Sequence, residues 1–338
     1  MAIERTSLLL FLAILLVEPV FAGWGHRPPE QPLTGYGSTD AYITSSWQEF
    51  TQGSAADGDL TWVYVPDQFK SGEQAPVVIF LHGFAVLSPN LYRSHIEHLV
   101  QQGNIVIFPL FQKSTFWGFL LESGIFTPMD QSIWARRAVA SVDRALQSLA
   151  DQVSWNEIYL YGHSLGGLIA LAWQEEGGVP LRHMVLSHPQ VNASAGMPDF
   201  VKAFVKVIEI PWQDYAPDIS APVVILNGVE DTIATTSQSE EIYRLLIKSP
   251  QLRYYVAQSD GYGYPPVSPN HGAPLDVIVG LPPHLKIFTI SGELDVLDWR
   301  FYFTALDAVM DGWPGELPFQ LGEWSDGTPL RPVEVVVL

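Results

Sequence analysis

IYLYGHSLGGLIALAW, residues 158–173, is the stretch that decides the fold of this chain. It begins with bulky strand-forming residues and ends in an unbroken apolar run typical of a buried helix. Between them lies Gly162-His163-Ser164-Leu165-Gly166, which matches the pattern G-x-S-x-G. In that pattern small residues let the backbone bend sharply from strand to helix and present the serine as a nucleophile. The alternative, a glycine-rich turn with a capping serine, is disfavoured by the strand and helix on either side.

The rest of the chain alternates apolar runs with helical patterns. Continuous apolar runs indicate strands buried on both faces of a sheet, and the longest amphipathic pattern predicts a helix over residues 129–150. Strands that alternate with helices form a mostly parallel sheet with helices on both faces, so the fold class is α/β. Two further strands predict an antiparallel N-terminal hairpin. The predicted strands are residues 41–50, 60–66, 76–81, 105–110, 157–161, 183–187, 223–227 and 252–258. The other predicted helices are residues 91–102, 166–175, 237–247 and 294–310.

The 338 residues divide by composition into four segments. Arg5 precedes an apolar run that ends near Ala22, which predicts a signal peptide over residues 1–22, with an uncleaved membrane anchor as the alternative. Residues 23–40 are rich in proline and glycine and predict a surface arm. Residues 41–311 form the α/β domain, and residues 312–338 a C-terminal extension packed on it. We therefore expect a secreted or periplasmic protein without stable membrane insertion after signal cleavage.

Charge and composition limit the partners. The formal net charge of −19 excludes nucleic acid, because phosphate binding needs clustered lysine and arginine. The chain has no cysteine, so an exported form depends on its core without disulfides. No cofactor or metal site is predicted. His95 and His98 are spaced as a metal pair on one helix, but no carboxylate or cysteine pattern completes a site, and solvated positions are the preferred interpretation. The oligomeric state is left open.

A serine nucleophile needs a base, and the base needs a third group to orient it. In this sheet order the acid and then the histidine follow the serine, each in a loop after a later strand. Asp231 leaves the strand at 223–227, with Glu230 as its close rival and a capping or turn aspartate as the alternative role. His271 follows the last strand and is the predicted base. His188 is the second choice, because it follows its strand but precedes the acid.

Two backbone N–H groups should face the oxyanion that forms during attack. One is predicted from Leu165 and the other from Phe84, in the turn that follows the strand at 76–81. His163 is expected to point away from the nucleophile. Two long connections, residues 112–128 and 190–217, are predicted to wall the substrate site, although their aromatic side chains could equally pack a satellite core. The candidate substrate-binding residues are Phe116, Trp117, Trp212 and Tyr215.

Three motifs now carry a family resemblance: Leu81-His82-Gly83-Phe84, Gly162-His163-Ser164-Leu165-Gly166-Gly167 and Asp231-Thr232-Ile233-Ala234. Over residues 41–310 the chain resembles the α/β-hydrolase fold family, and within it secreted bacterial esterases and lipases of the cutinase-like neighbourhood. The resemblance implies cofactor-free hydrolysis of a small-molecule or lipid carboxylic ester through an acyl-enzyme. The chain departs from cutinase-like enzymes in lacking cysteines for a C-terminal disulfide and in its long 231–271 interval. A peptidase or acyltransferase on the same three residues, or a catalytically silent binding protein, are the alternatives.

Overall fold

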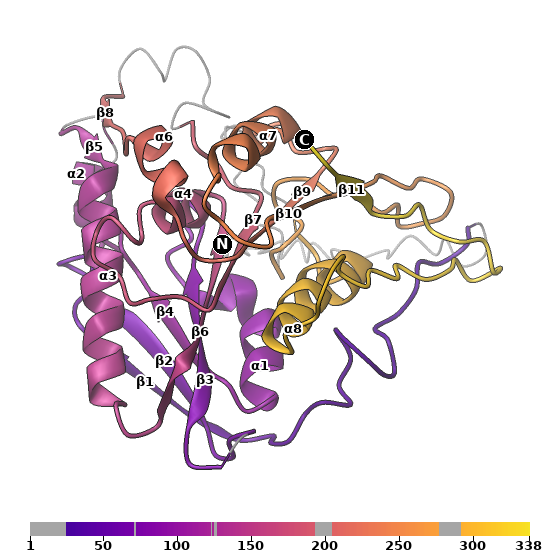
Figure 1. Ribbon diagram of the computed structural model, residues 1–338, viewed down its shortest axis with the longest axis horizontal. Coiled ribbons are helices and arrows are strands. Elements are labelled where there is room, and N and C mark those ends of the chain that lie inside the picture. The colour runs from indigo at the N-terminus through magenta and orange to yellow at the C-terminus, as the bar shows by residue number, and fades with distance from the viewer. Residues whose placement is uncertain (1–24, 71, 123, 125–126, 193–204, 277–291) are drawn as a thin grey trace, which may run out of the picture.

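The computed structural model describes residues 25–70, 72–122, 124, 127–192, 205–276 and 292–338 (Figure 1). The segment predicted as a signal peptide lies outside these residues. Within them a nine-stranded sheet runs in the order β1-β2-β4-β3-β6-β7-β9-β10-β11. From β4 to β10 neighbouring strands are parallel, whereas β1, β2 and β11 pair antiparallel with their neighbours. The predicted α/β fold with an antiparallel N-terminal hairpin is confirmed. The bounds are β1 (Trp47–Gln52), β2 (Thr61–Pro66), β3 (Ala75–Leu81), β4 (Ile105–Pro109), β6 (Val153–His163), β7 (His183–Ser187), β9 (Val223–Gly228), β10 (Arg253–Ala257) and β11 (Glu334–Val336).

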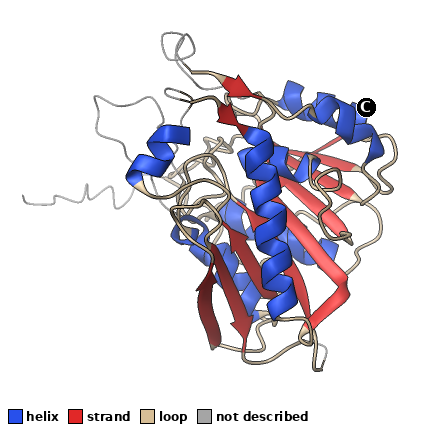
Figure 2. Ribbon diagram, turned by 90° about the vertical axis from the view of Figure 1, so that its left-hand side faces the viewer, coloured by secondary structure: helices blue, strands red, loops and turns tan. Residues whose placement is uncertain are grey.

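Helices cover both faces of this sheet and enclose two hydrophobic cores (Figures 1 and 2). Side chains alternate between the cores along a strand, as in β3, where Ile79 joins one core and Phe80 the other. One core is closed by α3 (Gln131–Ser148), α4 (Leu165–Leu171), α6 (Trp212–Tyr215) and α7 (Thr236–Leu245). The other is closed by α1 (Arg93–Gln101), the π-helical turn η4 (Asp298–Phe303) and α8 (Thr304–Met310). The remaining short elements are η1 (Pro89–Tyr92), α2 (Phe116–Glu122), β5 (Met129–Asp130), β8 (Val207–Ile208) and η2 (Ala216–Asp218).

Several boundaries differ from the prediction for local reasons. The helix predicted from residue 129 begins at Gln131, because the Asp130 side chain accepts hydrogen bonds from the backbone N–H of Ser132 and Ile133 and caps it. The strand predicted over residues 157–161 extends over β6, whose first half is partly exposed and lacks the continuous apolar signal of its second half. The first hairpin strand begins at Trp47.

Both ends of the described chain pack on the domain. The backbone N–H of Tyr264 donates to the carbonyl of His26, and that of Ser325 donates to the carbonyl of Arg27, each at 2.9 Å. The N-terminal arm is thereby tied to both the loop before His271 and the C-terminal extension. That extension returns to the sheet as β11, beside β10. Among the described residues, no helix is both long and apolar enough to cross a bilayer.

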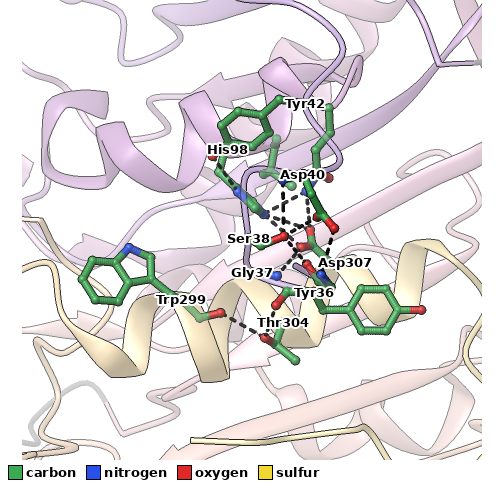
Figure 3. A network of polar contacts seen from close by, with 12 residues as sticks. Tyr36, Gly37, Ser38, Asp40, Tyr42, His98, Trp299, Thr304 and Asp307 are labelled. Atoms are coloured by element: carbon green, nitrogen blue, oxygen red, sulfur yellow. Dashed lines mark hydrogen bonds and ion pairs between the residues drawn. The ribbon is translucent and has the colours of Figure 1, made fainter. Parts of the chain in front are cut away.

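A buried polar network fastens the arm to α1 and α8 (Figure 3). His98 Nε2 lies 3.0 Å from Asp307 Oδ2, and the same carboxylate accepts from the backbone N–H of Gly37 at 2.8 Å and from the Gln102 amide at 3.0 Å. The Tyr42 hydroxyl meets the other His98 nitrogen at 2.9 Å. His98 and His95 are both buried, so the expectation of solvated positions is wrong. Helix α8 and η4 cover the polar face of α1, which the sequence pattern could not reveal.

Asp307→Ala is expected to lower the free energy of unfolding by about 3 kcal/mol, because it leaves buried donors without an acceptor. Burial raises the pKa of Asp307, but His98 and the hydrogen bonds from Gly37 and Gln102 outweigh burial and hold that pKa below its usual range. The stability that ionised Asp307 contributes is therefore present above an unfolded-state pKa of about 4 and is lost as the pH falls below it. Urea unfolding at pH 7 and pH 3 measures both effects.

The matched control is Asp311→Ala, one turn further along the chain. Asp311 forms an exposed ion pair with Lys70, which should contribute less than about 1 kcal/mol. Equal destabilisation by the two substitutions would contradict the assignment of the buried network as the fastening point.

Candidate active site

Ser164 occupies a sharp turn between β6 and α4. Its backbone has φ 55° and ψ −119°, a conformation that non-glycine residues rarely adopt. Glycines make the turn possible: a Cβ on Gly162 would lie 2.6 Å from the carbonyl oxygen of Gly166, and one on Gly166 would lie 2.2 Å from that of Leu81. Neither position can carry a side chain without moving the backbone. The motif therefore forms the strained strand-to-helix turn that its sequence predicts.

The three predicted catalytic side chains meet at this turn. His271 Nε2 lies 2.7 Å from Ser164 Oγ, and His271 Nδ1 lies 2.8 Å from Asp231 Oδ2. Asp231 follows β9 and His271 follows β10, so both come from the carboxyl end of the sheet, where β6 delivers Ser164. All three side chains are buried. The structure thus brings the three candidates together in the arrangement that a nucleophile, its base and an orienting acid require.

Asp231 is held by four donors. Its Oδ1 accepts from the backbone N–H of Ile233 and Ala234, each at 2.8 Å, and its Oδ2 accepts from His188 and His271. Burial raises the pKa of Asp231, but the hydrogen bonds from the two histidines outweigh it and leave that pKa far below its usual range. The carboxylate is therefore ionised at neutral pH. Because an ionised carboxylate only accepts, His271 carries its proton on Nδ1 and offers a lone pair at Nε2 to the serine hydroxyl.

His188 contacts the same oxygen of Asp231 as His271 does. Its Nδ1 is 2.7 Å from Asp231 Oδ2 and its Nε2 is 2.8 Å from the Tyr302 hydroxyl, so neither nitrogen faces Ser164. The structure therefore does not support His188 as the base. His188, Asp231 and His271 also bring potential metal-ligand atoms within 4.8 Å of one another. Direct hydrogen bonds of 2.7–2.8 Å join these atoms, which leaves no space for an ion between them.

The turn that follows β3 lies against the nucleophile. A Cβ on Gly83 would be 3.3 Å from Ser164 Cβ, and the His82 ring fixes the turn through a 2.7 Å bond from Nδ1 to the Gly83 carbonyl. Phe84 is the next residue. Leu165 is the first residue of α4, so its N–H has no acceptor within the helix. Both predicted oxyanion donors therefore belong to backbone segments that meet at Ser164.

His163 points away from the serine hydroxyl, as expected, but it has a structural role that the sequence did not reveal. Its Nε2 lies 2.9 Å from the His271 carbonyl and its Nδ1 lies 2.7 Å from the Tyr92 hydroxyl. That hydroxyl also accepts from the Gly83 N–H at 3.0 Å. Burial, with smaller effects from His271 and His188, keeps the pKa of His163 well below its usual value. The neutral His163 ring thus connects the turn at Gly83, through Tyr92, to the backbone of His271.

The four predicted substrate-binding aromatics do not form one group, although the rings of Phe116 and Trp117 are in contact. Phe116 and Trp117 are 74% and 71% exposed on α2, whereas Trp212 is 3% exposed and packs in the core beneath α6. Tyr215 is half-buried against the same core. On the inner side of α2, Phe119 packs on Phe84 at 5.9 Å between ring centroids. Helix α2 therefore contacts Phe84, in the turn after β3, whereas Trp212 is a core residue.

Comparisons with known proteins find one matching family model and chains of similar fold. A family model described as "Serine aminopeptidase, S33" matches residues 135–215, from α3 through Ser164 to α6. The chain is similar in structure to an uncomplexed acylaminoacyl peptidase of Pyrococcus horikoshii, with TM-score 0.54 and 16% identity over 81% of this chain and 43% of that one. It is also similar to a puromycin-hydrolyzing peptidase of Mycobacterium tuberculosis, with TM-score 0.51 and 18% identity over 68% of this chain and 37% of that one. A search of curated protein sequences finds no match.

The chain has the α/β-hydrolase fold, and Ser164, His271 and Asp231 are arranged as in a serine hydrolase. The expected fold is confirmed. The narrower likeness to cutinase-like esterases is not, because the matching family and structures are peptidases. The chain spans less than half the length of these two structures.

Proposed function

We propose that this protein is a serine peptidase that removes residues from the amino-terminal end of small peptides through an acyl-enzyme. The observation that carries the proposal is the hydrogen-bonded series Ser164, His271 and Asp231 at a positive-φ turn. The choice of a peptide bond is supported by the serine aminopeptidase model, which matches the segment that contains the nucleophile. Two chains of similar structure, which are peptidases, support the same choice.

In this proposal Ser164 Oγ attacks the carbonyl carbon of the scissile bond while His271 Nε2 takes the hydroxyl proton. The oxyanion accepts from the N–H groups of Leu165 and Phe84. His271 then gives its proton to the leaving nitrogen as the carbon–nitrogen bond breaks, which leaves an ester on Ser164 and releases an amine. Water, deprotonated by His271, hydrolyses that ester and restores the free serine.

A cavity next to the loop that carries His271 supports preference for a free amino terminus. It has a volume of about 670 Å³ and adjoins the loop that carries His271, whose neighbours Asn270 and Ala273 line it. Within the described part of the chain, its charged lining residues are Glu30, Glu293, Asp295 and Glu323, with Arg27 as the one cation. This excess of carboxylates attracts a protonated amine by simple Coulomb interaction.

The test compares three substrates that share one acyl residue: an aminoacyl 4-nitroanilide, its N-acetylated form and the corresponding p-nitrophenyl ester. We expect the free-amine anilide to be cleaved and acetylation to raise KM at least about tenfold, since it removes the positive charge. Turnover of the ester without any anilide cleavage would overturn the peptidase proposal. Absence of turnover of all three by folded protein would overturn the hydrolase proposal itself.

Ester hydrolysis is the second candidate function. It is favoured by the exposed aromatic rings of Phe116 and Trp117 on α2, the helix that contacts Phe84. Such rings suit an apolar acyl or alcohol group. Phe116→Ser combined with Trp117→Ser would then raise KM for long-chain esters while sparing the anilide, whereas the peptidase proposal expects no such difference.

A further inference from the structure

Asp231 is shared by two imidazoles. His188 and His271 both reach the same oxygen, Oδ2, at 2.7 and 2.8 Å, and their ring centroids are 6.0 Å apart and nearly perpendicular. His188 comes from the residue after β7, and it is fully buried. The series that begins at Ser164 therefore does not stop at the acid but continues through His188 to Tyr302 on η4.

The hydrogen-bond directions along this series follow from protonation. Burial lowers the pKa of His188, and the attraction of Asp231 only partly offsets that effect, so the ring is neutral at pH 7. Since the ionised Asp231 can only accept, the His188 proton is on Nδ1. Its Nε2 is then an acceptor, and the Tyr302 hydroxyl donates to it. The other titratable groups that face His188 are His163, at 6.2 Å between ring centroids, and His271.

The backbone of His188 has a strained conformation that hydrogen bonds hold in place. Its φ is 48°, in the left-handed region, and its N–H donates to the Leu226 carbonyl of β9 at 2.8 Å. The preceding carbonyl, of Ser187, accepts from the N–H of Ser164 at 3.0 Å. Strain of this kind persists only where surrounding contacts hold it. The contacts here join the nucleophile turn, the strand that leads to Asp231 and the ring that meets Asp231.

We propose that His188, aligned by Tyr302, is a positioning residue that holds the Asp231 carboxylate against His271 while His271 carries the proton taken from Ser164. This inference rests on the proposed serine-hydrolase function. The two backbone donors fix Oδ1, and His188 fixes Oδ2, so the carboxylate cannot rotate away when His271 becomes a cation. A neutral donor serves this purpose because it does not compete with His271 for the transferred proton. His188 and Tyr302 do not touch the substrate and are not catalytic residues.

The test uses four variants in the anilide or ester assay: His188→Leu, His188→Asn, Tyr302→Phe and the double variant His188→Leu/Tyr302→Phe. Leucine removes the donor, and we expect kcat to fall about 10- to 100-fold with KM within about twofold. Asparagine offers an N–H and tolerates a left-handed backbone, so it should recover most of kcat. Tyr302→Phe should lower kcat by about threefold to tenfold in the wild-type background. The double variant should have the same kcat as His188→Leu alone, because Tyr302 acts through His188.

A readout independent of turnover is the proton spectrum of the full chain. Wild-type protein should show two downfield nitrogen-bound protons, one from each imidazole bonded to Asp231, and His188→Leu should lose one of them. Unchanged kcat in folded His188→Leu, or an equal loss from Tyr302→Phe in both backgrounds, would overturn the inference. If His188→Leu does not fold, Tyr302→Phe serves as the test. The inference is then overturned if Tyr302→Phe keeps the wild-type kcat and the resonance of the His188 proton does not shift. Failure of the proposed function is distinguished by wild-type protein that neither turns over substrate nor reacts with a fluorophosphonate.

Discussion

Ser164→Ala is expected to lower turnover of every substrate by about 10⁴-fold or more and to abolish covalent labelling by a fluorophosphonate. The reason is geometric: Ser164 Oγ is the atom that His271 Nε2 contacts at 2.7 Å, and alanine leaves the base with no proton to accept. The label is located by peptide mass spectrometry, and residual turnover is measured with the free-amine anilide. Modified Ser164 in wild-type protein and no modified peptide in the variant is the expected result.

The variant should remain folded, because the removed hydroxyl is a small group and the glycines on either side still form the turn. Ser141→Ala is the matched control, since Ser141 is a buried serine on α3 whose hydroxyl bonds to the Asp59 carbonyl, away from the site. It should label and turn over as wild type does. Labelling of another residue in Ser164→Ala, with turnover preserved, would show that the nucleophile lies elsewhere.

The strands that the sequence predicted well are those buried on both faces. β7 was predicted with its observed bounds, His183–Ser187, because a central parallel strand is buried at every position and its middle residues are apolar. The exposed first half of β6 carries no such signal and was missed. Ser164, Asp231 and His271 could be predicted because each follows a strand of the sheet, and the chain order of such residues is set by the fold.

The partners of these residues could not be predicted in the same way. His188 follows a strand as Asp231 does, and only the three-dimensional structure shows that its ring meets the acid and not the serine. Tyr302 and Tyr92 lie on a helical turn and a short helix whose apolar patterns indicate only burial. Their hydroxyls contact histidines far away in the sequence, and no local periodicity records such contacts. Trp212 shows the converse, because an aromatic residue in a long connection was assigned to the substrate site and packs in the core.

Asp231→Asn is expected to lower kcat by about 10⁴-fold, because an amide cannot replace a carboxylate that accepts from four donors. In one orientation its NH₂ group faces the backbone N–H groups of Ile233 and Ala234, which now lie 2.8 Å from Oδ1. In the other orientation it faces the Nδ1–H groups of His188 and His271. Relief of that second conflict moves the His271 proton to Nε2, and the ring then presents a proton to Ser164 where it must present a lone pair.

Stability should change as well as rate. In Asp231→Asn the amide NH₂ faces other hydrogen-bond donors, which should lower the free energy of unfolding by about 1–3 kcal/mol at pH 7. Because the folded-state pKa of Asp231 is held below its usual range, its contribution is present above an unfolded-state pKa of about 4 and is lost as the pH falls. The difference between wild type and Asp231→Asn in urea unfolding should therefore shrink below pH 4.

Glu230→Gln is the matched control for Asp231→Asn, since it makes the same change of charge one residue earlier, on an exposed side chain that was the sequence rival for the acid. It should leave kcat within about twofold of the wild-type value and the free energy of unfolding within about 0.5 kcal/mol of it. Retention of more than about a tenth of wild-type kcat by Asp231→Asn would contradict an orienting role, given the loss that the same change causes in serine proteases. A larger loss from Glu230→Gln would move the acid to Glu230, and His271 would then have to leave the hydrogen bond that it makes to Asp231 in this structure.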